Sequence, residues 1–325
     1  MVDTKASDCR TIGHFYGVEG KKLQRQYRDY LSDFKDWKQK PHAKEWLIFP
    51  KNMGPYLSID ETALSKGELY TIITNKKAKG KKGAIVGIFS GTKAEPIMEQ
   101  LLRIPLKERK KVKEITLDMA NSMKTIAKKC FPKALQVTDR FHVQKLALEA
   151  LQDIRIKHRW DALDLENEAI KQARGSKEPF VPETFDNGDT RKQLLARSRY
   201  LLYKSPDNWT ENQSERSKIL FVHYPDIKAA YDLVKGLRNI FNTATSMETA
   251  YTKLAHWFRK VEGSGFKAFN TIVNTITHNY RSILNYFVNR STNASAESFN
   301  AKIKAFRAQF RGVKNVEFFL FRLTT

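Results

Sequence analysis

Two patterns of hydrophobic and polar residues divide this chain along its length. In three runs, at residues 56–62, 68–74 and 83–90, apolar residues alternate with polar ones or form short blocks rich in Ile, Val and Phe. Alternation with a period of two is the pattern of β-strands, because successive side chains of a strand point to opposite faces. The three runs follow one another directly, which predicts an antiparallel meander.

A helix and then a strand–helix–strand segment follow the meander. Residues 92–104 have helical periodicity, and Ile115 and Leu117 alternate into a fourth strand that ends at Asp118. Apolar residues at helical spacing then predict a helix that a proline stops, and a fifth strand ends at Asp139. This order predicts an α/β fold with a mixed five-stranded sheet flanked by helices.

The remaining segments have the period of about 3.6 residues that is typical of helices. Residues 1–50 suggest a pair of helices at 11–16 and 21–37, which is either a helix-turn-helix remnant that touches DNA or a packing pair with a solvated basic face. Between residues 143 and 284 only helical periodicity occurs, and a last helix opens at residue 293. Its predicted buried face consists of Phe299, Ile303, Phe306 and Phe310.

These patterns predict a chain of four parts. They are a small helical N-terminal region at 1–50, the first part of the core at 51–145, a large all-α insertion at 146–288 and the second part of the core at 289–325. An α/β sheet usually does its chemistry outside the carboxyl ends of its strands. Because Asp118 and Asp139 both follow a strand, we expect the site at that edge.

The charge of the chain indicates its partner. Lys and Arg number 58 against 35 Asp and Glu, a net charge of +23, whereas solubility needs only about 2–8 charges on a small domain. The excess favours a polyanion as partner, most simply nucleic acid. Candidate phosphate contacts lie in a lysine-rich loop between the second and third strands and on the last helix: Lys76, Lys77, Lys79, Lys81, Lys82, Lys304 and Arg307. The loop lysines fit a solvated hairpin tip equally well.

Other classes of protein are disfavoured. The sequence has no apolar run of about 20 residues that could span a bilayer, no strongly amphipathic basic terminus and no signal peptide. We therefore expect no membrane partner and a cytoplasmic protein. Two cysteines, Cys9 and Cys130, fit a reducing compartment and exclude a disulfide framework or a four-cysteine zinc site.

Three acids stand at the ends or in the middle of otherwise apolar elements: Asp60, Asp118 and Glu297. Carboxylates are rarely placed there unless something offsets their desolvation, as a divalent cation does. Mg²⁺ prefers oxygen ligands, and two ions about 3.5–4 Å apart can activate an attacking oxygen and stabilise the leaving oxygen in phosphodiester cleavage. Each acid by itself also fits a surface residue or a helix cap. Glu61 is a weaker candidate, because strand alternation points it away from Asp60.

Four segments of the sequence, SIDETAL, ITLDMANSM, FPKALQVTDRFHVQKL and SASAESFNAKIKAF, together resemble the ISL3-type transposases of bacterial insertion sequences and, more broadly, DDE transposases. The resemblance covers roughly residues 50–325. It implies an RNase H-like core with the order of elements predicted above, interrupted by a helical insertion. It also implies metal-dependent cleavage and strand transfer of DNA with two Mg²⁺ ions, for which we expect Mn²⁺ to substitute.

The resemblance also implies roles for single residues. Asp60 matches the first metal-binding aspartate, Asp118 the second and Glu297 the glutamate. Asp139 and His142 match an auxiliary Asp-x-x-His pair of mutator-like relatives. An alternative assignment makes Asp139 the second catalytic carboxylate, with Asp118 capping the following helix. His142 also fits a structural histidine that bonds to Asp139.

One departure from the family concerns the recognition of DNA ends. Such transposases usually carry a longer N-terminal region with a cysteine cluster and a helix-turn-helix, whereas residues 1–50 contain only Cys9. End recognition is then expected on a separate polypeptide or on the rest of a longer product. A homodimer on DNA and an association with the bacterial nucleoid are expected from the resemblance alone. Two alternatives stay open, a catalytically idle DNA-binding protein derived from a transposase and an RNase H-like nuclease.

Overall fold

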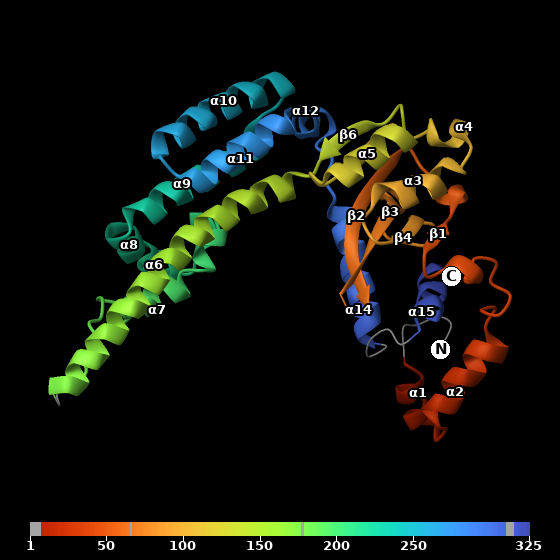
Figure 1. Ribbon diagram of the computed structural model, residues 1–325, viewed down its shortest axis with the longest axis horizontal. Helices are drawn as coiled ribbons and strands as arrows, with labels where there is room; N and C mark the ends of the chain where they lie inside the picture. The colour runs from red at the N-terminus through yellow and green to blue at the C-terminus, as the bar shows by residue number, and fades with distance from the viewer. Residues whose placement is uncertain (1–7, 66, 177–178, 310–314) are drawn as a thin grey trace. The chain divides into compact units, whose positions relative to one another are not determined.

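The structure is a computed structural model that describes residues 8–65, 67–176, 179–309 and 315–325. The chain divides into two compact units, which Figure 1 traces by colour along the sequence. Unit 1 is Met1–Asp139 together with Asn289–Thr325, and unit 2 is Arg140–Val288. Unit 1 therefore joins two stretches of the chain that unit 2 separates in the sequence.

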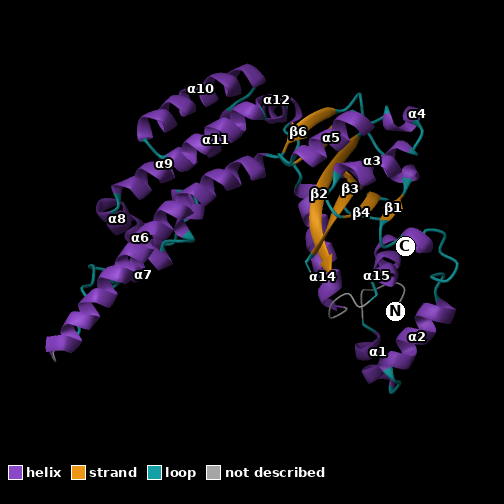
Figure 2. Ribbon diagram, in the orientation of Figure 1, coloured by secondary structure: helices purple, strands orange, loops and turns teal. Residues whose placement is uncertain are grey.

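Unit 1 is built on a mixed six-stranded sheet (Figure 2). The strands are β1 (Trp46–Ile48), β2 (Tyr56–Ser65), β3 (Glu68–Asn75), β4 (Ile85–Ser90), β5 (Glu114–Leu117) and β6 (Leu135–Thr138). Their order across the sheet is β1-β4-β3-β2-β5-β6. The β1/β4, β4/β3 and β3/β2 pairs are antiparallel, whereas β2/β5 and β5/β6 are parallel. The predicted meander followed by parallel strands is confirmed.

The sequence predicted five strands and only helices in residues 1–50. This prediction is wrong at β1, a sixth strand that lies within that segment. Trp46, Leu47 and Ile48 form too short a run to display a period of two. Their strand forms against the edge of β4, where Leu47 pairs with Ile88 and its side chain is fully buried. A pairing partner 41 positions further along the chain decides this element, so local pattern could not reveal it.

Seven α-helices accompany the sheet among the described residues of unit 1. They are α1 (Cys9–Tyr16), α2 (Gly20–Gln26), α3 (Ala94–Leu102), α4 (Leu106–Arg109), α5 (Asn121–Cys130), α14 (Ala294–Gln309) and α15 (Val316–Thr324). Helix α1 ends at Gly17, whose φ of 66° lies in the left-handed region that glycine adopts readily. The first helix of the predicted N-terminal pair is therefore confirmed.

The second predicted helix, at 21–37, is shorter than expected. Its α-helical part ends at Gln26 and is followed by a π-helical turn, Tyr27–Leu31. Beyond the turn, Phe34 lies edge-on to Phe318 of α15, with ring centroids 5.1 Å apart. This contact with the C-terminal helix, rather than the local period, determines the path of the chain here.

The sheet is covered on both faces, because both sets of alternating side chains have apolar members. Helices α3 and α5 cover one face, where the buried residues of β2 and β5 are Leu57, Ile59, Ile115 and Leu117. On the other face α14 runs along β2 (Figure 1). The buried residues that α14 and α15 contribute there are Phe299, Ile303, Phe319 and Leu320. Phe306 is partly buried in the same cluster, and the predicted Phe310 lies outside the described residues.

Unit 2 is helical apart from one isolated bridge in its described part (Figure 2). Its helices are α6 (Arg140–Ser176), α7 (Arg191–Arg197), α8 (Glu211–His223), α9 (Pro225–Thr243), α10 (Met247–Ser264), α11 (Lys267–His278), α12 (Tyr280–Leu284) and α13 (Tyr286–Asn289). Helix α9 begins at Pro225, because proline fits the first turn of a helix and not its interior. Among the described helices, none combines the length and the apolar character that crossing a membrane requires.

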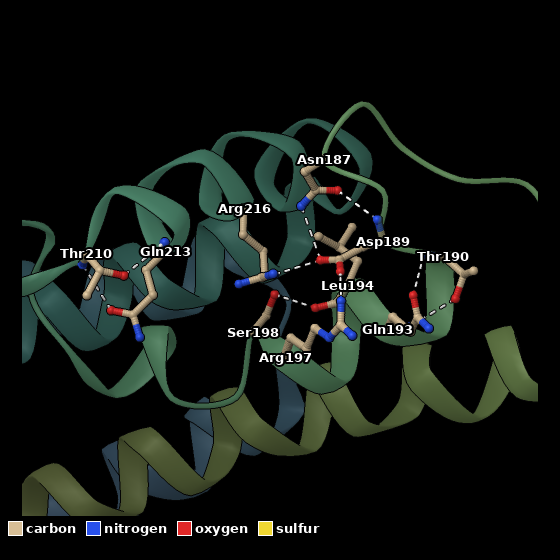
Figure 3. Close-up of polar contacts among 10 residues, drawn as sticks. All are labelled: Asn187, Asp189, Thr190, Gln193, Leu194, Arg197, Ser198, Thr210, Gln213 and Arg216. Carbon is tan, nitrogen blue, oxygen red and sulfur yellow. Dashed lines mark hydrogen bonds and ion pairs between the residues drawn. The ribbon is translucent and has the colours of Figure 1, made fainter.

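A buried carboxylate organises the loop that enters α7 (Figure 3). Asp189 is fully buried and accepts hydrogen bonds from Arg197 and, at 2.7 Å, from the Nε of Arg216. Burial acts to raise the pKa of Asp189, but the hydrogen bonds from Arg216 and Arg197 outweigh burial and the pKa is lowered. Folding therefore favours the ionised carboxylate, which connects the loop to α7 and α8.

Asp189→Ala is expected to lower the free energy of unfolding at pH 7 by about 3 kcal/mol, the lower end for breaking a buried ion pair. Because the folded-state pKa is lowered, this contribution is present above the unfolded pKa of about 3.9 and is lost as the pH falls through the folded value. Urea unfolding followed by circular dichroism at pH 7 and below pH 3 measures both effects. The exposed Asp186→Ala is the control, and an equal loss in both variants contradicts the role of Asp189.

Candidate active site

Asp60 lies on β2, and Asp118 directly follows β5, the parallel neighbour of β2. The register of β2 with β5 pairs Ser58 with Thr116, and Asp60 and Asp118 stand two positions further along. Adjacent strands lie about 4.8 Å apart, and residues two apart on a strand share a face. Continued by two positions beyond its last recorded pair, this register places Asp60 beside Asp118, the first residue after β5.

The carboxylate of Asp60 is held from two sides. Its Oδ1 accepts the backbone N–H of Glu61 at 2.9 Å, and its Oδ2 accepts the side-chain amide of Asn300 at 2.6 Å. Asn300 lies on α14, 240 residues away in the sequence. The hydrogen bond connects α14 to the middle of β2 and orients the Asp60 carboxylate.

Asp118 makes a local contact at the start of the next helix. Its Oδ1 accepts the backbone N–H of Ala120 at 2.7 Å, immediately before α5. This bond closes a turn just before the helix and is not the helix cap that the alternative assignment expects of Asp118, because the N-cap position is Ala120 and no side-chain cap is formed there. It leaves the carboxylate able to bind a cation, because a carboxylate offers about four lone-pair sites. Asp60 and Asp118 are both half-buried, so solvent reaches them.

Glu61 lies close to the two aspartates, although strand alternation made it the weaker candidate. Burial raises the pKa of the half-buried Glu61 carboxyl, and the negative charges of Asp118 and Asp60 raise it further. We call Asp60, Glu61 and Asp118 the acidic edge. Neighbouring negative charges that raise the pKa of the Glu61 carboxyl mark a place where a cation would be stabilised. Lys124 of α5 is a cationic neighbour, whose pKa burial lowers and the charge of Asp118 acts to raise.

Glu297 lies in the first turn of α14, three residues before Asn300. It is exposed, and residues three apart lie on neighbouring parts of a helix face. Within the described part of the chain, no three His, Cys, Asp or Glu side chains form a group that could hold a metal ion. The structure thus places Asp60 and Asp118 within electrostatic reach of Glu61 and connects the helix of Glu297 to Asp60. No three of these carboxylates form a metal-holding group in the described part of the chain.

Asp139 is placed differently from the acidic edge. It is almost fully buried, and its Oδ2 accepts the backbone N–H of Asn293 at 3.1 Å, just before α14. In the same region the Nζ of Lys76 donates to Thr116 at 2.7 Å and lies 3.5 Å from the carboxylate of Glu114. Burial lowers the pKa of Lys76, while the charges of Glu114 and Asp139 act to raise it. Lys76, one of the predicted phosphate contacts, is therefore engaged in a largely buried ion pair in this structure.

His142, the auxiliary partner predicted for Asp139, lies in unit 2. It stands in the first turn of α6, half-buried, with its ring edge-on to that of Phe141. Asp139 belongs to unit 1, so the two residues lie in different units. The bond between them stays a prediction.

The lysine-rich loop between β3 and β4 contacts α14. The Nζ of Lys302 donates to the carbonyl of Gly80 at 3.4 Å. Gly80 has a φ of 69°, and a Cβ there would lie 3.2 Å from that Nζ, so both the turn and the close approach suit glycine. Arg307 instead donates to the backbone carbonyls of Ala63 and Leu64. We define the basic surface as the exposed lysines of the loop and of α14, which are Lys77, Lys79, Lys81, Lys82, Lys302 and Lys304.

Known proteins share the segments that build this site. The family model of ISL3-type DDE proteins, described as a transposase, matches residues 57–323. The chain belongs to the ISL3 family of DDE transposases. It is 23% identical over 272 residues to the transposase for insertion sequence element IS1001 of Bordetella parapertussis. The aligned residues make up 82% of this chain and 60% of that protein. It is also 30% identical over 132 residues to the transposase for insertion sequence element IS1557 of Mycobacterium tuberculosis. The aligned residues make up 40% of this chain and 29% of that protein.

This member of the ISL3 family thus spans about three-fifths of the length of the first of those relatives. Its structure adds three residues that the sequence analysis did not single out, namely Asn293, Asn300 and Lys302. The spacing of three between Glu297 and Asn300 on one helix is the signal that could have found Asn300. No such signal exists for Asn293, because its partners Ser58 and Asp139 are 235 and 154 residues away.

Glu61→Gln is expected to stabilise the protein at pH 7 by up to about 1 kcal/mol, the scale of a partly exposed charge interaction. Because the folded-state pKa of Glu61 is raised, folding disfavours its ionised form. The cost is absent below the unfolded pKa of about 4.3 and is complete once the pH has risen through the folded value. Thermal unfolding at pH 7 and below pH 4 measures the difference, with the exposed Glu68→Gln on β3 as the control. A Glu61→Gln variant no more stable than the wild type at pH 7 contradicts the raised pKa.

Proposed function

We propose that this chain is the catalytic region of an insertion-sequence transposase, which cleaves DNA at the ends of its element and transfers the freed strands to a target. The observation that carries the proposal is the acidic edge, where Asp60 on β2 and Asp118 directly after the parallel strand β5 lie within electrostatic reach of Glu61. Membership of the ISL3 family supports the reaction class. In this scheme water cleaves the strand, and the 3′-hydroxyl so freed attacks the target DNA.

The chemistry of the acidic edge fits Mg²⁺ or Mn²⁺. Asp60 and Asp118 offer carboxylate oxygens, and Mg²⁺ needs only one or two carboxylates besides water and substrate phosphate. Burial raises the pKa of Glu61, and the negative charges of Asp118 and Asp60, which a cation would offset, raise it further. We propose that these two aspartates hold two ions. The chemistry that such ions supply is stabilisation of charge on the phosphate and activation of the attacking oxygen.

Glu297 is the third carboxylate of the proposed site. The hydrogen bond from Asn300 to Asp60 supports this role, because it holds the helix of Glu297 against β2 within one turn of the glutamate. The described carboxylates are not grouped around a single point. We infer that Glu297 joins the two aspartates when DNA phosphate and cations are bound, since these neutralise the charge that keeps the acids apart.

The same proposal accounts for the fold. Three antiparallel strands followed by two parallel additions, with α3 and α5 between the later strands, support an RNase H-like core to which β1 adds one edge strand. Unit 2 lies in the sequence between β6 and α14. We propose that it is the all-α insertion of this core, and that the segment at 1–50 is a separate region that ends in β1.

The basic surface is the proposed path of the DNA backbone. Its lysines come from the loop before β4 and from α14, the helix that also carries Glu297 and Asn300. The net charge of +23 supports a polyanionic substrate. Phosphates that flank the scissile bond would contact these lysines while the acidic edge acts on the bond itself.

A catalytically idle DNA-binding protein is the second candidate. The observation that favours it is that the described acids form no group of three that could hold a metal ion. Both candidates bind DNA through the basic surface, so binding does not separate them. Strand cleavage in Mg²⁺ or Mn²⁺ does, and transfer of the cleaved strand to a second duplex separates a transposase from a simple nuclease.

Asp60→Asn, Asp118→Asn and Glu297→Gln are each expected to lower strand cleavage by at least about 10²-fold, because a metal site contributes several kcal/mol of charge stabilisation. DNA binding should persist, since the basic surface is unchanged. Cleavage is measured on a labelled duplex that carries the ends of the insertion sequence, in Mg²⁺, in Mn²⁺ and in EDTA, and binding by fluorescence anisotropy. Glu95→Gln, an exposed acid on α3, is the control. Normal cleavage by any of the three variants removes that residue from the site.

Replacing Lys79, Lys81 and Lys82 together by Gln is expected to weaken DNA binding irrespective of sequence. The slope of log Kd against log salt should fall by about 0.9 for each phosphate that a lysine no longer neutralises. Anisotropy titrations between about 50 and 200 mM salt measure the slope. The matched control replaces three exposed lysines on or beside α4 and α5, which are Lys107, Lys110 and Lys128. An equal change in both triple variants contradicts a DNA path along the basic surface.

A further inference from the structure

We propose that Asp139, Asn293 and Ser58 form an anchor that positions the first turn of α14, and with it Glu297. In this proposal Asp139 is a positioning residue and not a metal ligand. We call these three residues the α14 anchor. The role given to Glu297 rests on the proposed function. The placement of α14 itself does not, so the two can be tested separately.

Asp139 has the surroundings of a positioning group. It is 1% exposed, whereas Asp60 and Asp118 are half-buried. Its backbone N–H donates to the carbonyl of Leu117 at 3.0 Å and so extends the pairing of β6 with β5. Its Oδ2 accepts the backbone N–H of Asn293 at 3.1 Å. A buried carboxylate needs hydrogen-bond donors of this kind, because burying the charge without them raises the free energy of the folded state.

The negative charge of Asp139 already has a compensating cation. Lys76 lies within electrostatic reach of both Asp139 and Glu114, and its Nζ is 3.5 Å from the Glu114 carboxylate. Asn289, close to the anchor in the sequence, donates to the same Glu114 carboxylate at 3.1 Å. A largely buried lysine close to both acids, together with the N–H donated by Asn293, lowers the cost of burying the Asp139 carboxylate without a metal ion.

Asn293 passes the contact from the sheet to the helix of Glu297. Its backbone carbonyl accepts the N–H of Glu297 at 2.9 Å, and its side-chain Oδ1 accepts the hydroxyl of Ser58. Asn293 and Ser58 are both almost fully buried, and Ser58 lies two residues before Asp60 on β2. Asn293 therefore contacts the residue that follows β6, the first part of β2 and the first turn of α14.

Glu297 consequently lies between two fixed points of its helix. The anchor holds the chain at Asn293, and the hydrogen bond to Asp60 holds it at Asn300. Fixing both ends of this stretch fixes the rotation of the helix, and the rotation decides which way the Glu297 side chain faces. The α14 anchor thus determines how closely Glu297 can approach the acidic edge.

Two substitutions of Asp139 separate positioning from metal binding. Asp139→Asn keeps an acceptor oxygen for the N–H of Asn293 and removes the charge, whereas Asp139→Ala removes both. We expect cleavage in Mn²⁺ to fall about 10²-fold in the Ala variant, the scale for a misplacement of about 1 Å. The readout is whether the conservative variant rescues cleavage. We expect Asp139→Asn to cleave within about tenfold of the wild-type rate, because its neutral amide oxygen still accepts the N–H of Asn293, although more weakly than a carboxylate does.

Amide hydrogen exchange reports the position of α14 independently of activity. Exchange of the amides at 294–300 should become roughly ten- to a hundredfold faster in Asp139→Ala and stay near the wild-type rate in Asp139→Asn. A Ser58→Ala, Asn293→Ala double variant removes the other hydrogen bond of the anchor and should raise the same rates, which keeps the test available if Asp139→Ala does not fold. Asp118→Ala is the contrast, with cleavage abolished and exchange in α14 unchanged.

Two results would overturn the anchor. The first is that Asp139→Asn loses cleavage as completely as Asp60→Asn while amide exchange at 294–300 stays unchanged. Asp139 would then be a metal ligand. The second is unchanged exchange in both Asp139→Ala and the Ser58, Asn293 double variant. If the wild-type protein binds DNA and never cleaves it, the proposed function fails, and the exchange rates alone then support or overturn the anchor.

Discussion

The attachment of one late helix to the sheet is the constraint on which the candidate active site depends. Asn300 donates to Asp60 and Asn293 donates to Asp139, across sequence separations of 240 and 154 residues. Contacts between such distant residues cost chain entropy when they form. They persist because a buried polar group left without a partner costs more than an ordinary hydrogen bond contributes. Helix α14 therefore has one position on β2, and the acids of the site are held relative to that position.

Burial sorts the charges of unit 1 into separate roles. Asp60, Glu61 and Asp118 are half-buried, and the two aspartates raise the pKa of Glu61 in concert with its burial. Lys76 and Glu114 are largely buried as a pair, in which each offsets the other. The lysines of the basic surface are exposed. This separation allows one unit to attract phosphate along its surface and cations at its edge, which is the combination that cleavage of a phosphodiester requires.

Much of the secondary structure could be predicted from the sequence, because local pattern determines it. The strands that contain or precede Asp60, Asp118 and Asp139 were predicted from the alternation of their residues. The parallel arrangement of β5 and β6 was predicted because helices alternate with these later strands in the sequence. The failures have non-local causes. β1 forms only against β4, and the helix that was expected to reach residue 37 ends early as Phe34 packs on Phe318. Likewise Lys76 looked like its exposed neighbours in the loop until the fold placed Glu114 beside it.

The sequence by itself determined the family, the overall charge and the acids that the chemistry needs, because these depend on residue identity and local spacing. Tertiary structure alone decided which of those residues meet. The parallel pairing of β2 with β5 brought the strand of Asp60 next to the strand that Asp118 follows, and the packing of α14 brought Asn300 to Asp60 and Asn293 to Asp139. The physical reason is that hydrogen bonding and electrostatic interactions act over a few ångströms in space, whereas a sequence records distance only along the chain.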